Sequence, residues 1–386
     1  MISGRFMLIE PTTLILIISL AIGLATGFVM HRSDYCVTGM FRDAIMFRTP
    51  SALRALCLQI AVTMILFELL RRAGALPFYP FPLIGKPSLA NLVGGIVFGV
   101  GMVLAGGCVV GTLYKMGAGS ITSLFALIGL IIGSGLYPEI HPGWAAFIKA
   151  TTLADVVTLP QLLAINPGVM VAVVAVPAIV HFIRWRRQQA PADASVVTGY
   201  IEPWRAGLIL ALLSAISYIL LGMPLGISTT YTKIAAIIEN LFIPEHVSRV
   251  AYFKALPLNA FHRLLDTQLL GGAGPALDSI WDIQFPLILG ITFGSTLSAL
   301  MLGEFAIRCN IPGRQMLTAL LGGAIMGLGS RLTPGCNIWH LMGGIPILAM
   351  QSLLFLVGLP IGTWIGGKIL FRLLAAQTTC SVKQGA

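Results

Sequence analysis

The sequence predicts an all-α protein that crosses a membrane several times. Of its 386 residues, 57% are hydrophobic and only 10% are charged, and the mean hydropathy is +0.91. A soluble domain carries roughly 25% charged residues, so this chain lacks the charge needed for a water-exposed surface. Several apolar runs approach the ~20 residues that a membrane-spanning helix needs. They cover residues 12–30, 52–70, 166–183, 204–222, 283–303 and 345–367.

The distribution of positive charge predicts how these helices are oriented. The net charge is +10, and Arg and Lys are concentrated in segments 32–54, 184–205, 308–314 and the tail after Lys368. Loops on the cytoplasmic side of membrane proteins are enriched in these residues. We therefore expect the run 12–30 to enter from outside and the run 52–70 to return. Arg71 and Arg72 depart from this scheme, because they fall on the outer side.

A polar stretch divides the chain into two halves. Residues 186–202 (RRQQAPADASVVTGYIE) combine charge with Pro, Ala and Ser, a composition typical of loops. We expect a cytoplasmic linker at 186–203 between a first transmembrane half, 1–185, and a second, 204–386. A polar insert at about 241–282 interrupts the second half. The N-terminal segment has neither a basic start nor a small-residue cleavage site, so no signal peptide is expected.

The two halves contain matching segments. The stretch GGIVFGVGMVLAGGC at 94–108 aligns without gaps to GGAIMGLGSRLTPGC at 322–336, with identity at seven of 15 positions. The matches include four glycines, a leucine and a closing Gly-Cys pair. Under the charge assignment, the first copy is entered from outside and the second from the cytoplasm. The sequence therefore predicts inverted internal repeats.

Each copy ends in a sequence that favours a break in the helix. Gly- or Pro-interrupted segments at matching places in inverted halves mark substrate sites in transporters. Non-helical backbone at membrane depth persists only where protein or a cavity surrounds it. We interpret 106–108 (GGC) and 334–336 (PGC) as breaks near the membrane midplane that aim backbone N–H groups at a pathway. The candidate substrate-binding residues in these breaks are Gly107, Cys108, Gly335 and Cys336. The alternative is that the glycines serve close helix packing and the cysteines are small buried apolar residues.

A third cysteine, Cys36, lies among charges in the stretch RSDYCVTGMFRD at 32–43. A thiol beside fixed positive charge is more readily ionised, which makes Cys36 and Arg32 candidates for contact with a substrate. The alternative is that the neighbouring Arg and Asp residues balance one another at a cytoplasmic edge.

Arg331 lies inside the second repeat, where the first repeat has Val103. An arginine at membrane depth is costly and usually faces a cavity or a partner. Arg331 is therefore a candidate counter-charge for an anion, unless its side chain reaches to the membrane interface. His340, four residues after Cys336, is either a ligand or a satisfied interior histidine.

Several function classes lack their sequence signature. The chain has no C-x-x-C, no Cys–His zinc spacing and no cysteine ladder, so neither a disulfide scaffold nor a metal cluster is indicated. No nucleotide motif or other cofactor signature is present, and we expect neither an enzyme nor a nucleic-acid-binding protein. The positive charge is explained by membrane orientation or by a basic pathway for an anion. A membrane thiol oxidoreductase and a channel for a soft metal remain alternatives.

The cysteine motifs resemble those of the YeeE/YedE family of sulfur-compound transporters. The similar stretches are RSDYC with TGMFRD at 32–43, LAGGCVVGTLYK at 104–115 and Gly-Cys at 335–336, and the resemblance extends from about residue 14 to 372. It implies uptake of thiosulfate across the bacterial inner membrane, with selenium compounds proposed for some YedE-type members. It also implies an hourglass-like bundle with inverted halves and short re-entrant helices. The substrate-contacting cysteines implied by the motifs are Cys36, Cys108 and Cys336.

The last motif departs from one branch of this family. Many thiosulfate-type members continue it as G-C-T-I-G-H, whereas this chain has Gly335-Cys336-Asn337 followed by Ile-Trp-His. This motif and the insert at 241–282 are more similar to the YedE branch. Asn337 is accordingly a further candidate for substrate binding, and a selenium compound is the alternative substrate. Family members often work with a small soluble sulfur-carrier protein, which the resemblance makes a possible partner.

Overall fold

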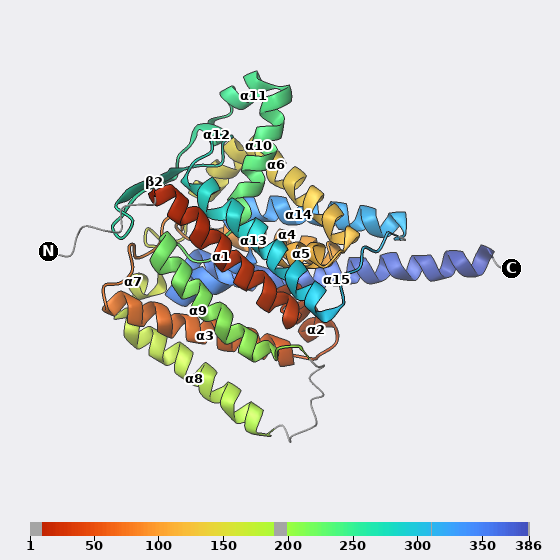
Figure 1. Ribbon diagram of the computed structural model, residues 1–386, viewed down its shortest axis with the longest axis horizontal. Coiled ribbons are helices and arrows are strands. Elements are labelled where there is room, and N and C mark those ends of the chain that lie inside the picture. The colour runs from red at the N-terminus through yellow and green to blue at the C-terminus, as the bar shows by residue number, and fades with distance from the viewer. Residues whose placement is uncertain (1–9, 189–198, 310, 385–386) are drawn as a thin grey trace.

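The computed structural model describes residues 10–188, 199–309 and 311–384 as a helical bundle with one small hairpin (Figure 1). Most of the predicted linker lies outside these residues. The elements of the first half are α1 (Pro11–Arg32), α2 (Val37–Met46), α3 (Ser51–Arg72), α4 (Leu89–Leu104), α5 (Val109–Gly117), α6 (Ile121–Ala150), α7 (Leu159–Leu163) and α8 (Pro167–Gln188). Those of the second half are α9 (Pro203–Leu221), α10 (Ser228–Phe242), α11 (Pro244–Arg249), α12 (Ala251–Lys254), β1 (Leu258–His262), β2 (Thr267–Gly271), α13 (Ser279–Leu302), α14 (Gly313–Leu332), η1 (Trp339–Gly344), η2 (Ile345–Ile347) and α15 (Met350–Gln384).

The prediction of an all-α polytopic membrane protein is confirmed. In the described part of the chain, eight helical segments are long and apolar enough to cross a membrane, and six of them overlap the apolar runs found in the sequence. The run 345–367 begins five residues too early, because residues 345–347 form η2. The other two segments are Leu89–Gly117, which joins α4 and α5 across a break, and Ile121–Ala150, which is α6. α6 continues through Pro138 and Pro142, residues that usually interrupt a helical pattern.

The basic segments gather at one end of the bundle. α1, α8 and α13 end there, and α9 and α14 begin there, on the right in Figure 1. Contacts join these segments, since Arg32 donates to the Gly199 carbonyl at 2.7 Å and Arg54 lies over the Trp185 ring. We call this the inner end, because positive charge marks the cytoplasmic side. The opposite end is the outer end.

Arg71 and Arg72 lie at the outer end, against the general charge bias. Both pair with Glu68, at 2.8 and 2.7 Å, and the Glu68 side chain is only 9% exposed. The carboxylate offsets part of their positive charge. The exception to the charge bias is therefore locally compensated.

The two matching segments, α4 and α14, pack against each other in opposite directions. Gly94 on α4 faces Thr333, whereas Gly101 faces Met326. A Cβ added at Gly101 would lie 2.3 Å from the Met326 nitrogen, so this glycine is required for the close approach of the two backbones. The packing alternative for the repeat glycines thus holds at this interface. The antiparallel contact also agrees with an inverted repeat.

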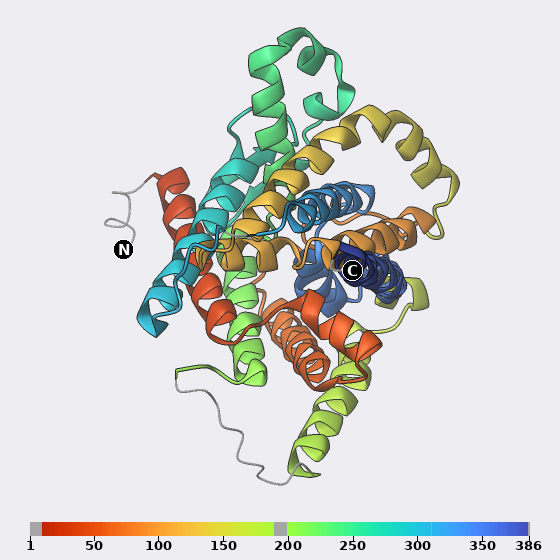
Figure 2. The same ribbon diagram turned by 90° about the vertical axis from the view of Figure 1, so that its right-hand side faces the viewer.

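Other long helices of the first half also pack on helices of the second half. α4 packs on α15 and α14 packs on α6, so each copy lies against the long helix that follows the other copy. α1 likewise packs on α13, and α9 packs on α3. Figure 2, a view of the inner end, shows α4, α14 and α15 side by side near the middle of the bundle. Both halves therefore contribute helices to the centre of the bundle.

The insert of the second half forms a compact outer structure. It comprises α11, α12 and an antiparallel hairpin whose register runs from Leu258↔Gly271 to His262↔Thr267. The fully buried Lys233 of α10 donates to the carbonyls of Gly272 and Gly274 and to Asp278. These bonds fix the end of the insert against α10. Sequence reasoning located the insert but not its hairpin.

Candidate functional site

Each of the three candidate cysteines lies at the start of a helix. Cys36 is the N-cap of α2 and Cys108 is the N-cap of α5. Cys336 directly precedes the helical backbone that begins at Asn337 and continues into η1. The first N–H groups of a helix have no partner inside the helix, and they give its N-terminus a partial positive charge. The cysteines therefore occupy positions suited to contact with an anion.

The predicted breaks are present, and glycines make them. α4 ends at Leu104 and α14 ends at Leu332. Gly106 (φ +73°) and Gly335 (φ +134°) have positive backbone angles, which only glycine adopts without strain. Gly107 lies in the first break with an ordinary angle and donates to the Met102 carbonyl. The left-handed residue of this break is thus Gly106, next to the predicted Gly107.

The cysteines come together in the interior. The sulfurs of Cys36 and Cys108 both lie within 3.4 Å of the position that a Cβ on Gly111 would take. The Gly111 N–H donates to the Cys108 sulfur at 3.3 Å. Val110, two residues after Cys108, and Ile338, two residues after Cys336, line one small void together with Ile227. Because Ile227 directly precedes α10, helix starts from both halves surround the cluster.

The cluster is buried, and its thiols are free. Cys108 and Cys336 are 0% exposed and Cys36 is 6% exposed, and all three are unpaired cysteines. Asn337 is also fully buried and lies beside the Cys108 thiol. In the described part of the chain, neither its Nδ2 nor its Oδ1 has a hydrogen-bond partner. A buried carboxamide without a partner is costly, and a polar guest beside Cys108 would supply hydrogen bonds to it.

A pocket of about 260 Å³ opens on the outer side of Cys336. We call it the outer pocket; Arg331, Gly335 and Trp339 are among its lining residues. Arg331 is 5% exposed and donates to the hydroxyls of Ser228 (2.8 Å) and Thr229 (3.3 Å) at the start of α10. Across the described residues, no carboxylate oxygen lies within 4.0 Å of its guanidinium. Arg331 therefore faces a cavity as a cation without a paired anion.

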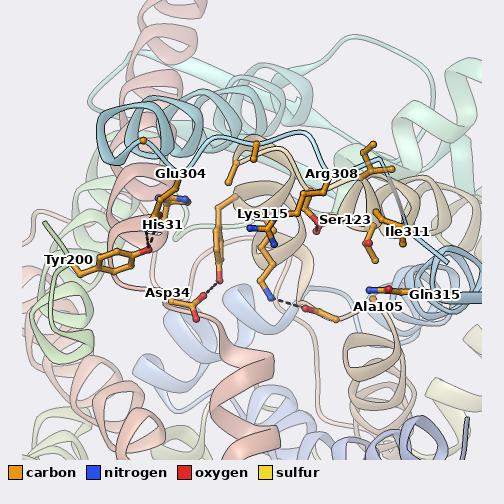
Figure 3. Close-up of a pocket in the computed structure, with 18 residues that line it drawn as sticks. His31, Asp34, Ala105, Lys115, Ser123, Tyr200, Glu304, Arg308, Ile311 and Gln315 are labelled. Carbon is orange, nitrogen blue, oxygen red and sulfur yellow. Dashed lines mark hydrogen bonds between the residues drawn. The ribbon is translucent and has the colours of Figure 1, made fainter. Parts of the chain in front are cut away.

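A larger pocket of about 940 Å³ lies at the inner end (Figure 3). We call it the inner pocket; Asp34, Gly106, Tyr114 and Lys115 are among its lining residues. The Tyr114 hydroxyl donates to Asp34 at 2.9 Å. Its ring is 2% exposed and lies close to Cys36 and Cys108. Tyr114 thus separates this pocket from the cysteines.

The outer and inner pockets share no lining residue. A void of about 10 Å³, lined by Val110, Ile227 and Ile338 among others, borders the outer pocket at Gly226. This is about the smallest volume that holds one water molecule. Movement of an ion through the cluster therefore requires the surrounding helices to separate.

Two further candidates do not join the cluster. Arg32 donates to the Gly199 carbonyl and lies over the Phe28 ring, and it lines neither pocket, so its contact with a substrate stays a prediction. His340 is fully buried beside the Ser352 hydroxyl at 2.9 Å and stacks on Phe355. It behaves as a satisfied interior histidine.

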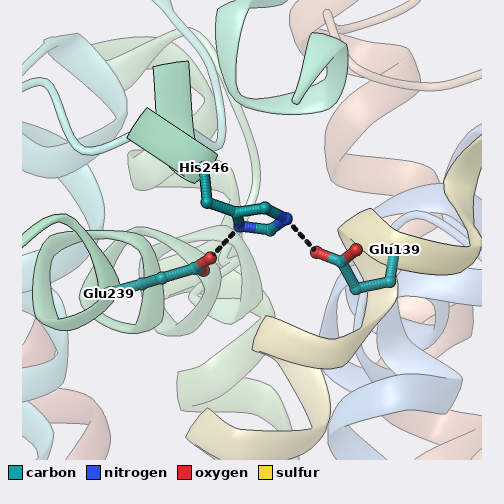
Figure 4. Close-up of side chains that lie close together, drawn as sticks. All are labelled: Glu139, Glu239 and His246. Carbon is teal, nitrogen blue, oxygen red and sulfur yellow. Dashed lines mark hydrogen bonds and ion pairs between the residues drawn. The ribbon is translucent and has the colours of Figure 1, made fainter. Parts of the chain in front are cut away.

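Another cluster of titratable side chains lies where α6, α10 and α11 meet (Figure 4). Glu139, Glu239 and His246 place their ligand atoms within 4.8 Å of one another. The Nδ1 atom of His246 faces Glu239 and its Nε2 atom faces Glu139 at 3.4 Å. Because each ring nitrogen meets a different carboxylate, the arrangement suits a protonated imidazole held between two anions.

Sequence reasoning did not find several groups around the cysteines. Tyr114 and Lys115 lie in the quoted stretch 104–115, but nothing in the pattern distinguishes them. Ser228 and Thr229, which hold Arg331, begin α10. The gapless repeat covers only 94–108 and 322–336, so it gives no signal at α10.

Comparison with known proteins identifies a family and two relatives that cover nearly the whole chain. A family model described as "Sulphur transport" matches residues 32–365. The thiosulfate transporter TsuA of Spirochaeta thermophila is 28% identical over 365 residues, which are 92% of this chain and 98% of that protein. The TsuA protein of Escherichia coli is 24% identical over 354 residues, covering 90% and 93% of the two chains.

Similarity to YedE proteins is more local. The probable transporter YedE of Escherichia coli is 32% identical over 82 residues, which are 21% of this chain and 20% of that protein. The match with the two TsuA proteins extends over nearly the whole chain. The relatives are transporters, in agreement with the expectation that the chain is not an enzyme.

Proposed function

This chain belongs to the sulphur transport family, and we propose that it takes up thiosulfate or a related sulfur-containing anion across the bacterial inner membrane. The substrate passes Cys108 and Cys336 at the constriction and Cys36 on the inner side. The observation that carries the proposal is the buried cluster of three free thiols at helix starts, with the unpartnered Asn337 beside it. The names of the full-length relatives support thiosulfate as the substrate.

The chemistry of the cluster suits such an anion. Thiosulfate carries two negative charges on hard oxygens and a soft terminal sulfur. Moving a charge into a low-dielectric interior without partners is very costly, so both ends of the anion need donors. Backbone N–H groups at helix starts suit the oxygens. Thiols are weak donors, and we infer that they suit a large polarizable sulfur.

The order of binding follows the two pockets. Arg331 attracts the anion into the outer pocket, where Gly335 and Trp339 lie next to the cysteine cluster. The thiols of Cys336, Cys108 and Cys36 then receive it by hydrogen bonds, without a lasting covalent bond. Weak donors at successive sites favour release, because conduction needs sites that bind without trapping. Beyond Tyr114 the anion reaches the inner pocket.

Substitution of single cysteines tests the proposal. Cys108→Ala and Cys336→Ala remove the donors at the constriction, and we expect them to abolish uptake of labelled thiosulfate into cells or proteoliposomes. Cys57→Ala is the matched control, because Cys57 is a free, exposed cysteine on α3. Uptake at the wild-type rate in both constriction variants would refute the cysteine pathway.

Cys→Ser variants separate the modes of contact. A serine hydroxyl keeps a donor but cannot form a disulfide or a persulfide. Retained uptake in Cys108→Ser and Cys336→Ser supports hydrogen bonding. Loss of uptake in these variants, together with a disulfide trapped in the wild-type protein during turnover, supports thiol redox chemistry.

Competition identifies the anion. Labelled thiosulfate uptake is measured in the presence of unlabelled selenite, selenosulfate, sulfite or sulfate. We expect unlabelled thiosulfate to compete best, because the full-length relatives are thiosulfate transporters by name. Stronger competition by a selenium compound would favour the alternative substrate. A small soluble sulfur-carrier protein is the proposed partner on the inner side.

A further inference from the structure

Lys115 presents an ammonium group that the proposed transport step does not yet use. It lies in the last turn of α5 and lines the inner pocket (Figure 3). Its Nζ donates to the Gly106 carbonyl at 2.8 Å. Within the described ranges, no carboxylate oxygen lies within 4.0 Å of it. Because an ammonium has three donors, two remain open to the pocket.

The carboxylates of the inner pocket are held by other groups. Asp34 accepts a hydrogen bond from Tyr114 at 2.9 Å, and Glu304 accepts from Tyr200 at 2.9 and 2.8 Å. Both carboxylates line the same pocket as Lys115. Each accepts a hydrogen bond from a tyrosine hydroxyl, and neither forms a salt bridge with Lys115.

The position of Lys115 relates it directly to the cysteines. Cys108 is the N-cap of α5 and Lys115 lies seven residues later on the same short helix, about 10 Å away along the axis at 1.5 Å per residue. Tyr114, the preceding residue, lies between the cysteines and the pocket. An anion that moves past Tyr114 meets Lys115 next. The Gly106 carbonyl that Lys115 holds belongs to the break that precedes Cys108.

We propose that Lys115 is an inner binding site for the transported oxyanion, which takes the two free ammonium donors through its oxygens. This site rests on the proposed function. Arg331 in the outer pocket is its counterpart, so a cation stands on each side of a neutral thiol cluster. If Lys115 served only to hold the Gly106 carbonyl, its removal would disturb transport equally from both faces.

Flux measured from the two faces distinguishes these roles. The full chain is assayed in right-side-out and everted membrane vesicles, with labelled thiosulfate added at increasing concentration. The readout is the ratio of the half-saturation concentration at the inner face to that at the outer face. Lys115→Met removes the charge and keeps most of the side-chain length. Lys115→Arg keeps the charge, and Lys149→Met, in the last turn of α6, is the matched control.

We expect Lys115→Met to raise this ratio about tenfold or more, because hydrogen bonds to charged groups are among the stronger ones. Lys115→Arg and Lys149→Met keep the ratio near the wild-type value. If neither half-saturation concentration changes in Lys115→Met while the wild type transports normally, the Lys115 site alone is overturned. If both half-saturation concentrations change by the same factor, the ratio is unchanged and the site is overturned in favour of the structural role. Wild-type vesicles that carry no thiosulfate in either direction overturn the proposed function and, with it, this site.

Discussion

At the residue scale, the two glycines with positive φ in the breaks make different demands on the structure. A Cβ added at Gly106 would meet no heavy atom within 4 Å, whereas at Gly335 it would lie 2.3 Å from the Trp339 ring. Both residues have positive φ. The first break therefore requires glycine for its backbone angle alone, and the second requires it also for space.

This contrast predicts unequal effects of alanine. Gly106→Ala adds only the strain of a left-handed residue, about 1–2 kcal/mol. Gly335→Ala adds a clash with Trp339 and is expected to lower the thermal unfolding midpoint of the detergent-solubilised protein much further. An equal or smaller fall for Gly335→Ala would mean that the second break rearranges easily.

Single residues were predicted unevenly from the sequence. Cys108, Cys336 and Arg331 stand out because they are rare residue types inside a matched, apolar repeat. Lys115 could not be identified, since the sequence does not show whether a carboxylate pairs with its ammonium group in the folded chain. Asn337 was identified only because it stands where the last motif departs from the thiosulfate-type pattern. Its lack of hydrogen-bond partners is a property of the folded chain.

At the element scale, hydropathy identified six of the eight candidate membrane spans and missed α6 and the α4–α5 segment. α6 carries Pro138 and Pro142 and still continues to Ala150. The segment of α4 and α5 is broken at 105–108, so neither piece alone is long enough to span a membrane. The β1–β2 hairpin escaped prediction because its strands are only five residues long and lie in a polar insert.

The short helix α11 is attached to its neighbours by His246. The Nδ1 atom of the ring faces Glu239 on α10 and its Nε2 atom faces Glu139 on α6. The hydrogen bond with Glu239 is the main cause that raises the pKa of His246 above its ordinary value of 6.5, and Glu139 raises it further. The other charged residues of α11, Glu245 and Arg249, pair with each other.

The attachment of α11 is therefore predicted to depend on pH. Since the folded pKa is raised, the stabilisation is complete below the ordinary pKa and is lost as pH rises through the raised value. Hydrogen-exchange protection factors of residues 245–249 should fall as the pH rises from below 6.5 through the raised pKa of His246. In His246→Gln the protection should be lower and independent of pH over this window. Wild-type protection that stays constant would show that the imidazolium does not hold α11.

At the scale of the whole molecule, helices from the two ends of the sequence pack on one another. α4 and α14 pack antiparallel at the centre, and α4 packs on α15 while α14 packs on α6. The repeat sequence predicted the inversion, because charge placed the two copies in opposite directions. It could not predict that the outer and inner pockets share no lining residue, since side chains such as Tyr114 lie outside the matched segments.

The most direct test of the cysteine pathway is a structure of the protein determined with saturating thiosulfate. We predict density for the anion at the centre of the bundle, with its terminal sulfur against the thiol of Cys108 or Cys336 and its oxygens toward helix-start N–H groups. Helices around the void at Val110 and Ile338 should then lie farther apart than in the present structure. An anion bound within the bundle along a route that touches none of Cys36, Cys108 and Cys336 would contradict the pathway.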